Sequence, residues 1–377
     1  MLLRRKLCVA VVIATILFLM LASQSIQRRH FLHLSLVIPI NRATPISQAT
    51  VSGKATVVKP TESPADLTPD PDPDPPRPPQ PEAEENPSVN SQYDQRSCGC
   101  PKSCISDPGG SFWFTKRYDP KQQPVLQDTN YNFDPDALKW WLGLQRSGTD
   151  QNPKEVMSKM FRVISPPGVD FSPLPSRCRS CAVVGNSGNL QRSGHGNLID
   201  SHNSVIRMNK AVTRGFEKDV GNRTTHHIVY PESAVDVDRG VSLVLLPFKL
   251  RDLEWLTSAL STGEVKMTYM RVRDRVKAEK DKVLVVNPEF LKYVNDHWTE
   301  NHGRYPSTGM LAIIFALHTC DQVSVFGYGA DHQGNWHHYW EANRYAGAFK
   351  TTGVHNADFE TKIINQLHKE GKISLHL

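Results

Sequence analysis

From residue 181 onward, short apolar runs rich in β-branched residues alternate with longer runs whose apolar residues recur at helical spacing. The short runs predict strands and the longer runs predict helices. The predicted strands are Cys181–Val184, Ser204–Met208, His226–Val229, Ser242–Leu246, Val283–Val286, Gln322–Phe326 and Lys372–Leu375. The predicted helices in this part are Arg251–Leu260, Pro288–Asp296, Thr308–Thr319 and Asp358–Lys369, and two further helices, Asp134–Gln145 and Pro153–Val163, are predicted before residue 181. Such an alternation indicates a single Rossmann-like α/β domain, with a mostly parallel seven-stranded sheet covered on both faces.

In open sheets of this kind, ligands bind outside the carboxyl ends of the strands. The loop after the first predicted strand, Gly185-Asn186-Ser187-Gly188, would let backbone N–H groups approach an anion or a sugar nucleotide closely. It is not the G-x-G-x-x-G dinucleotide fingerprint. Farther along, Ser307 or Thr308 opens an apolar helix. Either residue is an ordinary N-cap, or the helix N-terminus holds a phosphate.

The N-terminal segment indicates a membrane anchor. Cationic residues 4–6 precede an uncharged run, Leu7–Ile26, and Arg28 and Arg29 follow it. A helix of that length spans about 30 Å, the thickness of a bilayer core. A cleaved signal peptide is the alternative, but the run exceeds the usual apolar region of about 7–15 residues. We therefore expect a single-pass type II protein with residues 1–6 in the cytoplasm.

Residues 27–97 predict a disordered, extended stem. Of the 27 prolines in the chain, 11 lie between Pro60 and Pro87, interspersed with acidic residues. Such a stretch has too little apolar content to offset the entropy of ordering. Residues 98–377 then form the lumenal catalytic domain. An anchor, a stem and a globular domain in this order are typical of Golgi glycosyltransferases, but also of proteases and sulfotransferases. Cleavage of the stem to release a soluble form stays open.

The overall composition excludes several classes of protein. The formal net charge is +6, from 44 Lys and Arg against 38 Asp and Glu. This mild excess argues against a dedicated nucleic-acid binder, in which basic residues cluster. Nothing in the composition fits a collagen, a coiled coil or a multi-pass membrane protein. The sequence does not determine the oligomeric state, so a homodimer stays open.

Six cysteines follow the anchor: Cys98, Cys100, Cys104, Cys178, Cys181 and Cys320. In an oxidising lumen they would form three disulfides, for which about 15 pairings exist. Zinc is the rival interpretation, because Cys178 and Cys181 form a C-x2-C pair. We favour disulfides, since the cysteine clusters do not repeat a ligand spacing.

Four motifs follow one another along the globular part. They are a large motif from Cys178 to Gly221 with the core Cys181–Leu190, a small motif from Pro306 to Gly329, His338-Tyr339-Trp340-Glu341, and His355-x4-Glu360. With these motifs the chain resembles the animal sialyltransferases, and more closely the β-galactoside α-2,3-sialyltransferases acting on Galβ1-3GalNAc. The resemblance covers Cys98 to Leu377.

The resemblance implies a GT-A-like variant of the Rossmann fold and an activity. Sialic acid would pass from CMP-sialic acid, with inversion, to the galactose 3-hydroxyl of glycoproteins or glycolipids at the Golgi membrane, without a metal or other cofactor. His355 would be the general base, because the ordinary pKa of histidine lies near lumenal pH. His338 would contact the phosphate together with the start of the helix at Ser307-Thr308-Gly309.

The resemblance also implies the remaining site residues and the cysteine pairing. Donor-binding positions would be Asn186, Ser187, Asn209, Tyr230 and Gly329, and acceptor-binding positions would be Gln145, Tyr269, Tyr305 and Trp336. The implied disulfides are Cys98–Cys104, Cys100–Cys178 and Cys181–Cys320. Separately, Asn222-Arg223-Thr224 is a sequon that permits glycosylation of Asn222.

One triplet points to a different function. Asp236-Val237-Asp238 is a D-x-D sequence, by which many Golgi transferases bind manganese and a nucleoside diphosphate sugar. The alternative function is therefore a metal-dependent galactosyl- or hexosaminyltransferase. The stem contains the same pattern in its Asp-Pro-Asp repeats, and no sialyltransferase motif includes Asp236. We interpret the triplet as surface acid in a loop.

Overall fold

The structure is a computed structural model that describes residues 97–107, 111–128, 132–145, 151–166, 168, 170–343 and 353–377. These residues belong to the second of two compact units, Ala83–Leu377. The predicted anchor at 7–26 and all but the last residue of the predicted stem lie outside the described residues. In the described ranges, no helix has both the length and the apolar character required to cross a membrane.

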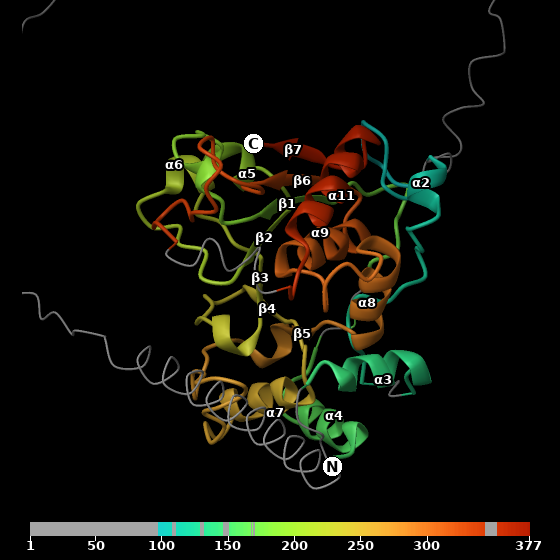
Figure 1. Ribbon diagram of the computed structural model, residues 1–377, viewed down its shortest axis with the longest axis vertical. Helices are drawn as coiled ribbons and strands as arrows, with labels where there is room; N and C mark the ends of the chain where they lie inside the picture. Colours follow the sequence, from blue (N-terminus) through green and yellow to red (C-terminus); the bar gives the residue numbers. More distant parts are fainter. Residues whose placement is uncertain are drawn as a thin grey trace, which may run out of the picture. The chain divides into compact units, whose positions relative to one another are not determined.

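The seven predicted strands form one sheet in the described unit (Figure 1). The strands are β1 (Ser180–Val184), β2 (Ser204–Met208), β3 (His226–Val229), β4 (Ser242–Leu245), β5 (Val283–Val285), β6 (Gln322–Phe326) and β7 (Ser374–His376). All neighbouring pairs are parallel, in the order β5-β4-β3-β2-β1-β6-β7. The chain adds β2 to β5 on one side of β1, and β6 and β7 on the other. The order of addition therefore reverses between β1 and β6, where such sheets bind ligands.

The six predicted helices are present with shifts of a few residues. They are α3 (Pro135–Gly143), α4 (Pro153–Phe161), α7 (Leu250–Ala259), α8 (Pro288–Tyr293), α9 (Thr308–Thr319) and α11 (Ala357–Lys369). After Tyr293 the chain continues as a π-helical turn, Val294–Trp298. Among the described residues, three short α-helices were not predicted: α2 (Phe112–Thr115), α5 (Gly196–Asp200) and α6 (Glu217–Val220). Elements of four or five residues are too short to show a helical period.

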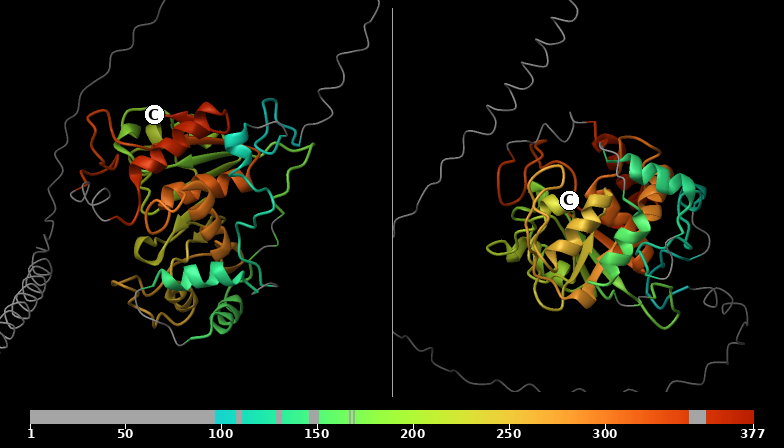
Figure 2. Two further views of the ribbon diagram at one scale, coloured as in Figure 1. Left: turned by 45° about the vertical axis from the view of Figure 1, so that its right-hand side comes forward. Right: turned by 90° about the horizontal axis from the view of Figure 1, so that it is seen from below.

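Helices cover both faces of the sheet (Figures 1 and 2). On one face, α8, α9 and α11 pack on Val183, Ile206 and Val244. On the other, α3, α4 and α7 pack on β4 and β5, while α5 and α6 pack on β1 and β2. Every residue of α9 from Met310 to Thr319 is buried. This helix is therefore the centre of the core, and its two ends are fixed in position.

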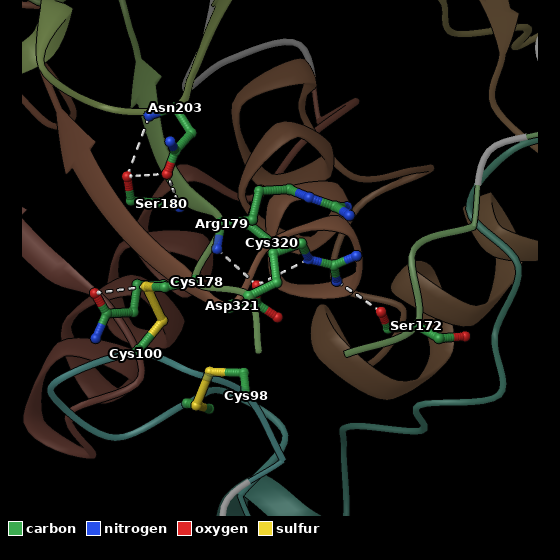
Figure 3. A network of polar contacts seen from close by, with 12 residues as sticks. Cys98, Cys100, Ser172, Cys178, Arg179, Ser180, Asn203, Cys320 and Asp321 are labelled. Carbon is green, nitrogen blue, oxygen red and sulfur yellow. Dashed lines mark hydrogen bonds and ion pairs between the residues drawn. A yellow bond between two sulfur atoms is a disulfide. The ribbon is translucent and has the colours of Figure 1, made fainter. Parts of the chain in front are cut away.

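A disulfide fixes the C-terminal end of α9. The structure contains the bonds Cys98–Cys104, Cys100–Cys178 and Cys181–Cys320. The bond between Cys181 and Cys320 joins β1 to the residue after α9. Next to it, the Asp321 carboxylate accepts a hydrogen bond from the Arg179 backbone N–H at 2.7 Å (Figure 3). The Arg179 guanidinium donates to the Thr319 carbonyl at 2.5 Å. Since all six cysteines are bonded, none of them is available as a zinc ligand.

Candidate active site

A cavity of about 340 Å³ opens where β1 and β6 end. Most of its lining comes from the loops after β1, β2, β3 and β6 and from the N-terminal turns of α9 and α11. The predicted site residues among its lining are Asn186, Ser187, Asn209, Tyr230, Ser307, Thr308, Gly309, Gly329, Trp336, His338 and His355. Residues from four separate motifs therefore meet in one cavity.

Two glycines allow the loops after β1 and β6 to touch. A β-carbon on Gly185 would lie 2.3 Å from the Gly327 carbonyl oxygen, which no side chain could tolerate. Gly327 has a φ of +69°, a conformation that favours glycine. The Ser187 N–H donates to the Gly327 carbonyl at 3.1 Å. The backbone of the first loop is therefore held at the cavity with little side-chain bulk in front of it.

Two asparagines that line this cavity have acceptor atoms without a partner. The Asn186 amide nitrogen donates to the Met208 carbonyl at 3.1 Å, which fixes the orientation of the side chain. Within the described residues, the Oδ1 atoms of Asn186 and Asn209 are buried and have no hydrogen-bond partner. A buried acceptor without a partner costs about 1–3 kcal/mol. This arrangement suits a ligand that carries N–H or O–H donors, such as a nucleobase or a sugar.

The N-terminus of α9 supplies anion-binding groups. Ser307 caps the helix, since its Oγ accepts a hydrogen bond from the Met310 N–H at 3.1 Å. Thr308 and Gly309, in the first turn, line the cavity. Amides in a first helical turn have no partner within the helix, and the helix dipole adds partial positive charge. A phosphate would be stabilised at this position.

Glu360 holds this helix start in place, a role that the sequence motif did not reveal. One Glu360 oxygen accepts a hydrogen bond from the Ser307 backbone N–H at 2.8 Å, and the other accepts from the Ser307 hydroxyl. Both residues are buried. Burial raises the pKa of Glu360 to about 7, against the opposing effect of these two hydrogen bonds. The carboxyl group therefore joins α11 to α9 directly beside the cavity.

Tyr328 is a second residue that sequence reasoning missed. Its hydroxyl donates to the Gly309 carbonyl at 3.0 Å, and its ring lies against Gly185. It connects the loop after β6 to the α9 N-terminus. The signal that could have found it is its position between Gly327 and Gly329 in the small motif.

His355 lies at the cavity in a defined orientation. Its Nδ1 lies 2.8 Å from the Tyr305 carbonyl oxygen, so the neutral ring donates from Nδ1 and carries its lone pair on Nε2. Burial lowers the pKa of His355, and the hydrogen bond to Tyr305 opposes this shift. The neutral, basic form consequently persists to lower pH than in a free histidine. This is the state that a general base requires.

His338 lies beside the loop after β1. Its backbone pairs with Ser187 in an isolated antiparallel bridge. The ring stacks on Trp340 with centroids 4.6 Å apart, and its Nδ1 lies 3.3 Å from the Glu341 carboxylate. These contacts hold the His338 ring next to the loop after β1.

The three other predicted acceptor residues do not line this cavity. Tyr305 is connected to it, since its ring packs at 4.6 Å on Phe248 and at 5.1 Å on His355. Tyr269 is 67% exposed and lies below the Lys249 ammonium, at 4.6 Å. Gln145 is the last residue before a gap in the described chain.

The D-x-D triplet faces a different cavity. Asp236 and Asp238 line a space enclosed by residues 273–280, with no residue in common with the first cavity. The Asp236 carboxylate accepts hydrogen bonds from the Lys277 N–H and the Arg273 guanidinium, both at 2.9 Å. Its oxygens are thus already engaged with donors inside a loop. This geometry favours a structural role for Asp236 over a role as a metal ligand. Asp236 does not line the cavity that contains His355.

Comparison with known proteins gives a consistent result. Residues 125–372 match the family model described as glycosyltransferase family 29 (sialyltransferase). The chain is 53% identical over 281 residues to CMP-N-acetylneuraminate-beta-galactosamide-alpha-2,3-sialyltransferase 2 of Rattus norvegicus, covering 74% of this chain and 80% of the relative. It is 49% identical over 283 residues to the corresponding sialyltransferase 1 of Homo sapiens, covering 74% and 82%.

A solved structure is similar to this chain in both sequence and fold. The crystal structure of a mammalian sialyltransferase in complex with Gal-beta-1-3GalNAc-ortho-nitrophenol matches with a TM-score of 0.68 and 47% identity. The match covers 74% of this chain and 98% of that chain.

Proposed function

The chain belongs to glycosyltransferase family 29, the sialyltransferases, and from this premise we propose that it transfers sialic acid from CMP-sialic acid to the 3-hydroxyl of the terminal galactose in Galβ1-3GalNAc. The observation that carries the proposal is the juxtaposition of His355 with the α9 N-terminus and two unpaired asparagine acceptors around one cavity. The names of the similar α-2,3-sialyltransferases and the disaccharide bound in the solved structure support the choice of acceptor.

Each part of the reaction has a group in the cavity that suits it. His355 Nε2 takes the proton from the galactose 3-hydroxyl as this oxygen attacks the anomeric carbon of sialic acid. The bond from that carbon to the phosphate oxygen breaks on the opposite face, so the configuration inverts and CMP leaves. The phosphate gains negative charge in the transition state. The Thr308 and Gly309 amides and the His338 ring stabilise that charge because they are already in position.

The remaining residues divide between donor and acceptor. Asn186, Ser187, Asn209, Tyr230 and Gly329 bind the nucleotide and the sialyl group, while Gln145, Tyr269, Tyr305 and Trp336 bind the acceptor. The fold is a GT-A-like variant of the Rossmann sheet. No metal is needed, because the leaving group is a monophosphate that protein donors can stabilise. A pyrophosphate leaving group would benefit more from a divalent ion.

The same proposal includes location and partners. Residues 7–26 anchor the protein in the Golgi membrane, residues 27–97 form a stem, and residues 98–377 lie in the lumen. Three disulfides are consistent with an oxidising compartment. Asn222 is exposed, so its sequon is accessible for glycosylation. Acceptors are glycoproteins or glycolipids that end in Galβ1-3GalNAc.

The test uses the full chain purified in detergent, with CMP-sialic acid and a panel of disaccharides in EDTA. We expect transfer to Galβ1-3GalNAc, a product that an α-2,3-specific sialidase cleaves, and much slower transfer to Galβ1-4GlcNAc. The His355→Ala variant is the control for contaminating activity. Transfer only to a different acceptor, or a product resistant to that sialidase, would overturn the assignment.

A further inference from the structure

A short hairpin outside the catalytic cavity exposes apolar side chains. Met267 pairs with Arg271 across a tight turn, and the Val272 N–H donates to the Lys266 carbonyl at 3.1 Å. At its tip, Met267 is 54% exposed and Met270 is 51% exposed, next to the exposed Tyr269. Ordered backbone pairing thus holds three large apolar or aromatic side chains toward solvent within four residues.

Cationic residues flank this apolar tip along the chain. Lys266 and Arg271 adjoin it directly, and Arg273, Arg275 and Lys277 follow, all exposed, with the carboxylate of Asp274 among them. Arg273 is paired with Asp236, and the Arg275 guanidinium donates to the Ser261 and Thr262 carbonyls. Val272 and Val276 alternate with the arginines and are buried in the core, which directs the cations outward. In the described part of the chain, Lys266 and Arg271 form no ion pair. The tip is therefore an apolar patch with a positively charged collar.

The hairpin is fixed to the residues beside the active site. Thr268 donates a hydrogen bond to Glu232, two residues after Tyr230, which lines the catalytic cavity. The Lys249 ammonium lies 3.1 Å from the Asp252 carboxylate and over the Tyr269 ring. Because Glu232 and Asp252 are almost fully enclosed, this attachment is rigid. A surface that receives the hairpin tip would therefore lie next to the cavity.

We propose that this hairpin docks on a lipid bilayer that carries anionic headgroups, and so presents the cavity to glycolipid acceptors in that bilayer. Unbranched methionines can enter the interface while neighbouring lysine and arginine side chains extend to the headgroups. The collar complements anionic lipids in charge. The choice of glycolipid acceptors rests on the proposed function, whereas bilayer docking does not.

The first experiment measures docking without any transfer reaction. The full chain, with Cys8→Ser and Met270→Cys, is labelled at residue 270 with an environment-sensitive fluorophore and reconstituted in phosphatidylcholine vesicles. Adding about one-fifth phosphatidylglycerol should shift the emission to the blue, and high salt should reverse the shift. The same label on Leu198→Cys is the matched control, since Leu198 is 43% exposed and lies on α5, outside the hairpin. Equal spectra in both lipids for residue 270 would overturn the proposal.

The second experiment connects docking to the acceptor. The Met267→Ser/Met270→Ser variant should lose about tenfold in kcat/KM for a vesicle-bound glycolipid ending in Galβ1-3GalNAc, and keep the wild-type rate on the soluble disaccharide. Leu174→Ser/Leu198→Ser removes similar exposed surface elsewhere and should change neither rate. Equal loss on both substrates, or loss on an acidic glycoprotein with the vesicle rate intact, would overturn bilayer docking. If the wild-type protein transferred no sialic acid to either substrate, the proposed function would be refuted. The fluorescence experiment would still decide whether the hairpin docks on a bilayer.

Discussion

At the scale of single residues, the chemistry depends on which protonation state each buried group adopts. His355 and Glu360 belong to the same H-x4-E motif, yet burial moves their pKa values in opposite directions. The imidazole is kept neutral and basic, and the carboxyl is kept partly protonated. Both shifts follow from the higher cost of a charge away from water.

Replacing His355 with alanine should reduce turnover by about 10²–10⁴-fold, the usual cost of losing a general base. The affinity for CMP should stay within a few-fold, because the ring is not proposed to hold the nucleotide. Steady-state kinetics and calorimetric titration with CMP measure the two quantities. Turnover near that of the wild type would refute the role of His355.

The pH profile of the wild-type enzyme tests the same residue independently. Since burial lowers the pKa of His355, the neutral base is present above that pKa and protonated below it. The acidic limb of kcat/KM should therefore have an apparent pKa below 6.5 and be missing from the residual activity of His355→Ala. An acidic limb that persists unchanged in the variant would assign it to another group.

Glu360 gives a prediction about stability. Its pKa of about 7 in the folded state exceeds the ordinary value of 4.5, so its contribution is fully present below about pH 4.5 and is lost as the pH rises through 7. In the Glu360→Gln variant, the part of the decline in stability between pH 5 and 8 that comes from ionisation of Glu360 should be absent. Glu360→Ala should cost about 1–3 kcal/mol, since it leaves buried donors of Ser307 unpaired. Thermal unfolding across pH measures both effects.

Glu370 offers the matched control at the other end of α11. It lies at the surface, and its pKa is lowered chiefly by a hydrogen bond with Ser111. Glu370→Gln should keep the wild-type dependence of stability on pH over this range. A wild-type slope in Glu360→Gln would mean that Glu360 is ionised throughout.

The sequence predicted which residue types belong to the site, but not how they support one another. The contact between Ser307 and Glu360 joins positions 53 residues apart. The unpaired Asn186 and Asn209 acceptors depend on the pairing of β1 with β2, which brings the loops after these strands together. Local patterns contain no information on such contacts, because tertiary packing decides them.

At the scale of elements, the seven strands were predictable because each is a short apolar run rich in β-branched residues, and the six helices because each run is long enough to show a helical period. β7 starts two residues later than expected, at Ser374, and α8 changes to a π-helical turn after Tyr293. The disulfide pairing was not predictable from spacing. The resemblance to sialyltransferases implied it, and the structure contains it.

The bond between Cys181 and Cys320 makes a prediction at this scale. It closes a loop of about 138 residues, worth about 5 kcal/mol in the chain-entropy model, against about 2 kcal/mol for the short loop of Cys98–Cys104. A whole domain has a margin of only about 5–15 kcal/mol. Cys181→Ser, Cys320→Ser and the double variant should thus all fail to yield folded, CMP-binding protein. The Cys98→Ser/Cys104→Ser control should yield more.

Two further measurements check this bond. Dithiothreitol should inactivate the wild-type enzyme, because reduction separates β1 from the end of α9 and displaces the helix start that faces the cavity. Peptide mapping without reduction should recover Cys181 linked to Cys320. Active enzyme with a free thiol at Cys320 would contradict the prediction.

At the scale of the whole domain, the site exists because the order of strands reverses between β1 and β6. That reversal brings together the loop at Gly185, the loop at Gly327 and the N-terminus of α9. The sequence indicated a parallel sheet but not the neighbours of each strand. Strand order depends on which helices cover which face, and several arrangements satisfy the same periodic pattern.

The distance of the D-x-D triplet from the catalytic cavity bears on whether a metal takes part in the transfer reaction. Asp236 and Asp238 lie in a cavity distinct from the one that contains His355, and Asp236 is engaged with Lys277 and Arg273. Asparagine at position 236 can still accept the hydrogen bond from the Lys277 N–H, and the ion pair lost with Arg273 is exposed and worth about 0–1 kcal/mol. Asp236→Asn/Asp238→Asn should therefore keep nearly full transferase activity, and EDTA should leave the wild-type rate unchanged. A manganese-dependent galactosyltransferase in the same buffer controls for effective chelation. Loss of wild-type activity in EDTA that manganese restores, together with an inactive double variant, would instead establish the metal-dependent alternative.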